Sequence, residues 1–182
     1  MTSPIDLRDA VVAELKVLMP TVARNIEGHD GRIDADAIKS WIRTTPAIRV
    51  AVLGARRIVP VGNGKVDISW IVGVYAVEKD AAAAAGLTTA VIINAEGNQR
   101  ALENVFTPQD MRCDNLHAST LERSGVTIWA ATWTQTIRTG VDALAETGVV
   151  PTNAFASRSP EIGEAYRSDY RDVQTGEAPP DE

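Results

Sequence analysis

Cysteine, histidine and aromatic residues are scarce in this chain of 182 residues. It contains one cysteine, Cys113, and two histidines, and only 5% of its residues are aromatic. A single cysteine excludes an intrachain disulfide framework and is typical of proteins in a reducing compartment. No stretch approaches the roughly 18 uninterrupted apolar residues of a membrane span. The first residues also lack the basic and apolar regions of a secretory signal. We therefore expect neither membrane insertion nor export by that route.

The chain also lacks an excess of positive charge. Eighteen basic residues stand against 24 acidic ones, which gives a net charge of −6 and an isoelectric point near 5.0. A general nucleic-acid-binding protein would present a basic surface, so the composition argues against that function. Apolar residues make up 45% of the chain, enough to bury a core. Its length predicts one domain, or one domain with an arm.

The first third of the chain predicts two helices and a short strand. Ser3 and Pro4 mark the start of a helix that Pro20 ends. Residues 22–27 favour a short strand, and residues 34–45 favour a second helix that stops before a proline. The first helix presents an apolar stripe at helical spacing: Leu7, Val11, Leu15 and Leu18.

A long β-hairpin is expected next. Residues 47–61 are rich in branched apolar side chains, and residues 66–76 alternate between apolar and other side chains. Gly62-Asn63-Gly64 between them supplies the positive φ angles of a tight turn. The second strand starts with Asp67 and Ser69 on its other face and continues with apolar residues there. We therefore expect its start to be half-exposed and its middle to be covered on both faces.

The expected fold is α/β, of the α+β kind, with a mainly antiparallel sheet, a long hairpin, helices packed on the sheet and a C-terminal arm. A third helix is predicted over residues 80–106, with a loop containing Cys113 and His117 after it. A short strand is expected near 116–121, and residues 126–137 predict the last strand. The third helix is based on this spacing: Leu87, Val91, Ala95, Asn98, Leu102 and Val105.

Residues 151–182 differ in character, and we assign them to an arm that follows a domain over residues 1–150. The arm holds seven acidic and three basic residues, so −4 of the net −6 lies there. A helix-start signal at residues 159–161 predicts a short helix over 160–172. That helix would carry one apolar stripe, formed by Ile162, Tyr166 and Tyr170. Such a stripe needs a surface to cover it, either on its own domain or on a neighbouring subunit.

Groups able to catalyse a reaction or to bind a metal are few. His29 reads as part of a surface turn rather than of a catalytic dyad. Cys113 and His117 would supply two of the four ligands of a structural zinc, and no further cysteine or nearby histidine completes the set. Gly62-Asn63-Gly64 begins a G-x-G pattern, but Asp67 and a strand follow it instead of a glycine and a helix. We therefore expect no catalytic, cofactor-binding or metal-binding residue.

Five residues are candidates for a subunit interface. Arg56-Arg57 is the basic doublet of the chain, and such a doublet more often serves a solvated edge or a salt bridge with a neighbour than a nucleic-acid site. The tryptophans follow core periodicity, although Trp129 or Trp133 could anchor an interface. With the stripe of the arm, the candidates are Arg56, Arg57, Ile162, Tyr166 and Tyr170.

Two segments resemble a known family. Residues 44–54 (Thr-Thr-Pro-Ala-Ile-Arg-Val-Ala-Val-Leu-Gly) form a proline-led strand that follows a helix and closes on glycine. Residues 70–78 (Trp-Ile-Val-Gly-Val-Tyr-Ala-Val-Glu) are followed by an alanine-rich segment and a helix. With the order of elements over residues 5–140, they resemble the tail terminator (tail completion) proteins of Mu-like phages and prophages. These are apolar patterns rather than catalytic signatures, and the long C-terminus departs from the family.

The resemblance implies a structural virion protein that assembles in the host cytoplasm and resides at the tail–neck junction. It implies a homo-oligomeric ring, commonly a hexamer, that caps the tail tube and stops its polymerisation. The implied partners are the tail tube protein, a neck or head–tail connector protein and, if the tail contracts, the sheath protein. The genome would pass through without sequence-specific binding. No cofactor and no catalysis are implied.

Two other functions remain open on the sequence. The chain could be a different neck component, such as a head–tail joining protein, which would bind on the portal side. It could also be an enzymatic or small-molecule-binding α/β domain, which would be a monomer or dimer with a deep polar cleft.

Overall fold

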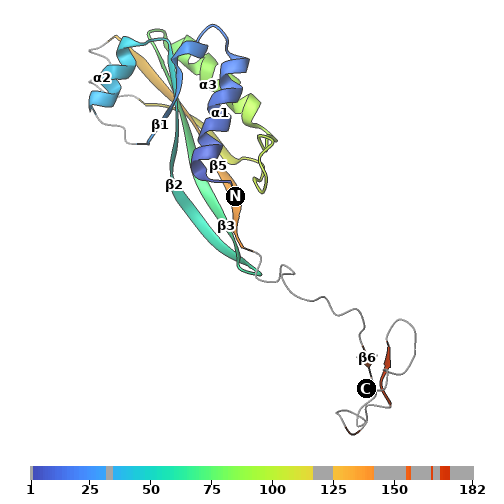
Figure 1. Cartoon of the computed structure of the whole chain (residues 1–182). Coiled ribbons are helices and arrows are strands. Elements are labelled where there is room, and N and C mark those ends of the chain that lie inside the picture. Colours follow the sequence, from blue (N-terminus) through green and yellow to red (C-terminus); the bar gives the residue numbers. More distant parts are fainter. Residues whose placement is uncertain are drawn as a thin grey trace. The chain divides into compact units, whose positions relative to one another are not determined.

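The computed structural model describes residues 2–31, 35–116, 125–141, 155–156, 165 and 169–172. Its contacts divide the chain into two units, Met1–Ala143 and Leu144–Glu182. The first unit is an α+β domain with a five-stranded sheet and three helices (Figure 1). In the second unit, β6 (Phe155–Ala156) pairs with β7 (Arg171–Asp172) in antiparallel fashion.

The sheet of the first unit is mixed, and its centre is a long hairpin. The strand order is β1 (Ile26–His29), β2 (Ala47–Gly62), β3 (Lys65–Glu78), β5 (Thr127–Gly140) and β4 (Gln109–Asn115). The first pair is parallel and the other three pairs are antiparallel. The predicted α+β class, the mainly antiparallel sheet and the long hairpin are thus confirmed.

The first helix, α1 (Pro4–Leu18), starts as its sequence predicts. The Asp6 amide donates to the Ser3 hydroxyl at 3.2 Å, and the Ser3 amide donates to the Asp6 carboxylate at 2.7 Å. These reciprocal bonds satisfy two of the free donors at the helix start, and the bond from the Ser3 backbone lowers the pKa of Asp6. One face of the helix is buried against the sheet through Leu7, Val11 and Leu15.

Two helices cover one face of the sheet and one helix covers part of the other (Figure 1). α1 and α3 (Ala81–Ala95) enclose the main core, to which β2, β3 and β5 contribute alternate side chains. α2 (Ala35–Arg43) packs on the opposite face, where the Trp41 and Tyr75 rings stack at 5.9 Å. The main core includes these strand residues: Ile48, Val50, Val72, Val74, Ala131, Trp133 and Ile137.

Gly73 of β3 is needed for the packing under α2. A Cβ atom at this position would lie 2.9 Å from the Tyr75 hydroxyl oxygen, because the ring of Tyr75 lies over the glycine. Burial of that ring also raises the pKa of the Tyr75 hydroxyl. The second face of the sheet is therefore well packed at the α2 end, as the covered middle of the strand predicts.

Three expectations about secondary structure are wrong in detail. The helix predicted over residues 80–106 ends at Ala95, because Gly97 takes a positive φ of 68° and the backbone turns away. The segment predicted as a loop around Cys113 contains strand β4. The strand expected over 22–27 is a 3₁₀ turn, Ala23–Asn25, followed by β1.

Some expectations fall where little is described. His117 and most of the strand expected near 116–121 lie outside the described residues. The same holds for Ile162, Tyr166 and most of the helix expected over 160–172, within which Arg171 and Asp172 form β7.

Candidate assembly surface

The hairpin of β2 and β3 continues well beyond the helices (Figure 1). β1 pairs with β2 only from Ile48 to Ala51, so the outer edge of β2 has no strand beside it from Val52 to Gly62 in the described part of the chain. β3, on the inner side, pairs along nearly the whole of β2. A free strand edge presents unpaired N–H and C=O groups that can receive a strand of another chain.

This free edge is also apolar. Leu53, Ile58 and Val61 are 41%, 63% and 42% exposed. Pro60 and three register shifts interrupt the edge, and both features restrict indiscriminate strand pairing. The edge of β2 therefore combines an unpaired backbone with exposed apolar side chains, while its irregularities limit the partners that fit.

The chain covers the corresponding part of β5 with one of its own loops. The Phe106 amide donates to the Thr136 carbonyl at 2.9 Å, and the Arg138 amide donates to the Asn104 carbonyl at 2.8 Å. An isolated bridge joins Val105 and Ile137 between these bonds. This loop covers β5 beyond the end of β4, whereas no described residue pairs with the outer edge of β2 at the same level, which makes the β2 edge the stronger candidate for assembly.

The two candidate arginines have different environments. Arg56 reaches across the sheet face and forms an ion pair with Asp110 of β4 at 2.8 Å. It also donates a hydrogen bond to the Thr134 hydroxyl at 3.5 Å. Arg57 is exposed and has no ion-pair partner among the described residues. The doublet therefore divides into one arginine that binds its own sheet and one that is free for a neighbour.

Arg56 borders a hollow on the part of the sheet that α2 does not cover. The hollow has a volume of about 250 Å³ and is lined by Arg56, Ile71, Asp110, Arg112, Thr132, Trp133 and Thr134. Nearby, the hydroxyls of Ser69 and Thr136 lie 2.8 Å apart. We call this region, together with the Asp67–Arg138 pair described below, the open face.

Two ion pairs within the chain lie on the open face. Arg138 of β5 donates two hydrogen bonds to Asp67 of β3, at 2.7 and 2.8 Å. These bonds are the main cause that lowers the pKa of Asp67, and the same contact raises the pKa of Arg138. Arg56 is likewise paired with Asp110, whereas Arg112, which lines the hollow, and Arg57, which pairs in register with Ser69, have no ion-pair partner among the described residues.

The opposite edge of the sheet is β4, which has no strand on its outer side in the described part of the chain. All but one of its residues are exposed, the exception being half-buried Met111. Cys113 is exposed on this strand. Two exposed apolar side chains flank it, Phe106 and Leu116, each 39% exposed. Among the residues that the structure describes, the sheet therefore ends in a free edge on both sides.

A second hollow lies where α1 begins, beside the end of β1. It has a volume of about 270 Å³ and is lined by Pro4, Ile5, Arg8, His29, Asp30, Val52 and Trp70. Nδ1 of His29 accepts a hydrogen bond from the Gly31 amide at 3.1 Å, and the ring stands edge-on to Trp41 at 5.1 Å. His29 is therefore the last residue of β1, packed against Trp41, and not part of the surface turn that the sequence predicted.

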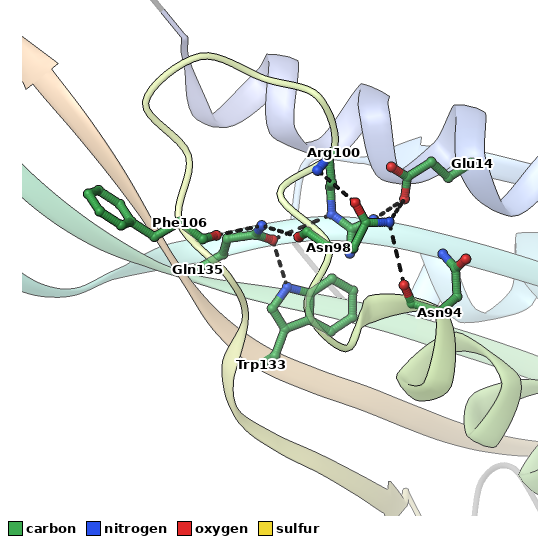
Figure 2. A network of polar contacts seen from close by, with 7 residues as sticks. All are labelled: Glu14, Asn94, Asn98, Arg100, Phe106, Trp133 and Gln135. Atoms are coloured by element: carbon green, nitrogen blue, oxygen red, sulfur yellow. Dashed lines mark hydrogen bonds and ion pairs between the residues drawn. The ribbon is translucent and has the colours of Figure 1, made fainter.

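A buried polar network that the sequence analysis missed fixes the loop after α3 (Figure 2). Arg100 is ion-paired with Glu14 of α1, and its guanidinium lies 5.3 Å from the Trp133 ring centroid. Burial lowers the pKa of Arg100, and Glu14 opposes this shift. The network thus anchors α1 and this loop to the core of the sheet.

Gln135 of β5 is the other centre of the network. Its amide nitrogen donates to the carbonyls of Asn98 and Phe106 at 3.1 and 3.0 Å, and its oxygen accepts from the Trp133 indole at 3.0 Å. Gln135 is fully buried. A glutamine between Trp133 and Ile137 on the core face of a strand was the available signal, because such a polar side chain requires partners.

Other sequence hypotheses can be placed as well. Trp133 is 1% exposed and belongs to the core, so it does not anchor an interface. In the described part of the chain, no group of three or more potential ligands could hold a metal ion. Within the same ranges, no helix has the length and apolar character that crossing a membrane requires.

The described residues define an α+β protein whose sheet has a free strand edge on each side and whose open face is polar and carries two ion pairs. Comparison with known families assigns it further: the family described as Bacteriophage Mu, Gp37 matches residues 4–136. The chain belongs to this family. It is therefore a Mu-like phage protein of the structural kind, which implies a virion component. No curated protein matches the chain.

Proposed function

We propose that this protein is the tail terminator of a Mu-like phage or prophage. Copies of the chain form a ring, commonly a hexamer in the resembled family, that caps the tail tube and stops its polymerisation. The other side of the ring receives the neck or head–tail connector protein. The site of action is the tail–neck junction of the virion, after assembly in the host cytoplasm.

The observation that carries the proposal is the free outer edge of β2. It offers an unpaired backbone from Val52 to Gly62 and three exposed apolar side chains on a structure that covers the matching part of β5. A cyclic ring of identical subunits has two different faces. One face can bind the tube end while the other lacks a surface for further tube subunits, which is sufficient to stop growth without any catalysis.

The charge distribution supports a passage for the genome. Six copies would carry about −36, and a negative ring repels the phosphate backbone. Arg56 and Arg138, two of the cations of the open face, are each paired with a carboxylate of the same chain. This pairing neutralises two arginines of the face and leaves fewer free cations to retain DNA. We propose that DNA passes the ring without sequence-specific binding.

A tube-growth assay tests this function. Purified tail tube protein is polymerised with and without the chain, and tube lengths are measured by electron microscopy. The proposal predicts shorter tubes as the chain is added, with the chain bound at tube ends and not along the tube walls. Unchanged tube lengths, together with binding to the portal-side connector alone, would instead identify another neck protein.

A further inference from the structure

We propose that the outer edge of β2 in one subunit pairs with the outer edge of β4 in the next, so that one continuous sheet runs around the ring. This inference rests on the proposed ring and names the two surfaces that build it. The two edges lie on opposite sides of the strand order β1-β2-β3-β5-β4. A contact between unlike edges leaves one of each kind free, so it repeats until the ring closes, whereas a contact between like edges ends at a dimer.

The β4 edge is short enough to pair within the free part of β2, and both edges carry exposed apolar side chains. β4 spans seven residues, and the free part of β2 spans Val52 to Gly62. Leu53, Ile58 and Val61 are exposed along β2, and Phe106 and Leu116 are exposed at the two ends of β4. Pairing of the edges would cover apolar side chains of both subunits, which stabilises association.

The distribution of charge favours pairing of β2 with β4 over pairing of β2 with a second β2. Arg57 of β2 is exposed without an ion-pair partner among the described residues, and the same is true of Asp114 of β4. Arg57 pairs in register with Ser69, and Asp114 with Ala130, which places both side chains on the α2 side of the sheet. A β2–β4 junction brings these opposite charges onto one face. A β2–β2 junction would bring two Arg56-Arg57 doublets into one interface.

The relative direction of β4 and β2 at the junction, and the displacement between them along the strands, follow from the pairing within the sheet. Going from β2 through β3 and β5 to β4 reverses direction three times, so β4 runs antiparallel to the β2 of the next subunit in a ring. In the register of the sheet, Cys113 pairs with Ala131, Ala131 with Val74, and Val74 with Val50. The free edge of β2 begins further along, at Val52, so β4 must be displaced along the strands to pair with it. The displacement along the strands between β4 and the free part of β2 is roughly 15–25 Å, and the four strands from β2 to β4 are about 19 Å wide. A ring closed by this junction therefore needs strands tilted by roughly 40–50° from the ring axis, close to the tilt in closed barrels.

Because side chains alternate between the two faces of a strand, the natural Cys113 can test the junction by disulfide formation. Cys113 pairs in register with Ala131, so it lies on the α1–α3 side of the sheet. On β2 the residues of that side are Ala55 and Ile58, opposite Trp70 and Ile68, and then Pro60. Val59, opposite Asp67, lies on the other side. A disulfide can form only between residues on the same face at short Cα separation.

The experiment introduces cysteine singly at Ala55, Ile58, Pro60 or Val59 in the chain that keeps Cys113. After mild oxidation, non-reducing gels are compared with the oligomer mass in solution. At least one of Ala55→Cys, Ile58→Cys and Pro60→Cys is expected to give a ladder that ends at the ring, while Val59→Cys gives none. Adding Cys113→Ser to the linking variant should abolish the ladder.

Three results would overturn the inference while leaving the ring intact: no ladder from a chain that still forms rings, a ladder from Val59→Cys, or dimers linked through Cys113 alone. A chain that remains a monomer would overturn the proposed function as well. The unmodified protein provides a check that needs no variant. Maleimide should label Cys113 at least tenfold more slowly in the ring than in separated subunits, and equal rates would contradict the inference.

Discussion

Glu14 of α1 and Arg100 of the loop after α3 form an ion pair in which 1% of the Arg100 side chain is exposed and 27% of the Glu14 side chain. Asn98 donates to the same Glu14 carboxylate at 3.2 Å and, through its own side-chain oxygen, accepts from the Arg100 amide at 2.7 Å. The positive charge of Arg100 is therefore compensated mainly by one carboxylate from a distant part of the chain.

Removing that carboxylate should strongly destabilise the domain. Glu14→Gln leaves a buried guanidinium without its counter-charge, and we expect the free energy of unfolding to fall by about 3 kcal/mol. Chemical denaturation monitored by tryptophan fluorescence measures this change. Asp9→Asn is the matched control on the same helix, because Asp9 pairs with Arg8 at an exposed position and should cost less than about 1 kcal/mol. Equal losses in the two variants would contradict the role of the pair.

Acid should lower the free energy of unfolding by protonating Asp67 on the open face. Its two bonds from Arg138 lower its pKa below the ordinary value of 3.8, so the unfolded chain takes up the proton first as the pH falls. The stabilisation is present above that value and is lost as the pH falls through the lowered pKa of the folded state. We expect Asp67→Asn to cost less than about 1 kcal/mol at pH 7. It should also make the free energy of unfolding depend less on pH between 5 and 3.

Arg138→Gln tests the same contact from its other side. Without the guanidinium, Asp67 loses the cause of its lowered pKa, and the acid dependence should flatten as it does in Asp67→Asn. Urea titrations at a series of pH values measure it. A dependence as steep as that of the unmodified protein in both variants would show that the pair does not contribute.

Charge reversal should separate the functions of the two neighbouring arginines. Arg57 has no ion-pair partner in the described chain, so Arg57→Glu should weaken self-association about tenfold without changing the fold, because it removes a charge offered to the neighbour. Arg56→Glu instead opposes Asp110 on its own sheet. Sedimentation measures the association, and circular dichroism verifies the fold.

The double variant Arg56→Asp with Asp110→Arg is the control for this pair. It restores an ion pair across the open face with the charges exchanged, so the fold and self-association should be closer to those of the unmodified chain than in Arg56→Glu. If Arg57→Glu leaves the oligomer unchanged, the outer edge of β2 is not the subunit interface.

Removal of the arm should affect assembly rather than folding. The first unit, Met1–Ala143, has its own core, so deletion of residues 151–182 should change its free energy of unfolding by less than about 0.5 kcal/mol. If the stripe of Ile162, Tyr166 and Tyr170 docks on a neighbouring subunit or on a neck or tube protein, the deletion should reduce ring formation or tail joining. Unchanged ring formation and tail joining would refute that hypothesis.

A point variant separates the stripe from the charge of the arm. Serine at all three stripe positions should reproduce the deletion, while Glu177→Gln with Asp181→Asn, which changes only charge, should not. Sedimentation and tail-joining assays compare the two variants directly.

The sequence predicted those elements whose residues are periodic. α1 was predicted with its cap because Ser3 and Asp6 form local bonds that depend on no other part of the fold. The hairpin was predicted because alternation and the turn at Asn63, with a φ of 53°, are also local. The half-exposed start and covered middle of β3 followed from the same alternation.

The errors arise where tertiary contacts override a local pattern. The helical spacing that continues past Ala95 is broken by positive φ angles at Gly97 and Arg100, and Val105 is buried by pairing with Ile137 rather than by helix packing. β4 was missed because it is short, polar and distorted at Asp110, whose φ is 53°. Such a strand is recognised only from its pairing with β5.

The candidate surface was predictable only in outline. The exposed edge of a long hairpin follows from its length, since the first strand is too short to cover it. That Arg56 would pair with Asp110, 54 positions away, and leave Arg57 free depends on how β4 is placed. The same holds for Gln135, whose partners come from a loop that the sequence assigned to a helix.

The most direct measurement of the central claim is electron microscopy of the purified chain mixed with preformed tail tubes, together with its mass in solution. The account predicts a closed ring in solution and extra density at tube ends, with none along the tube walls. A chain that stays monomeric at micromolar concentration and leaves the tube ends bare would contradict it.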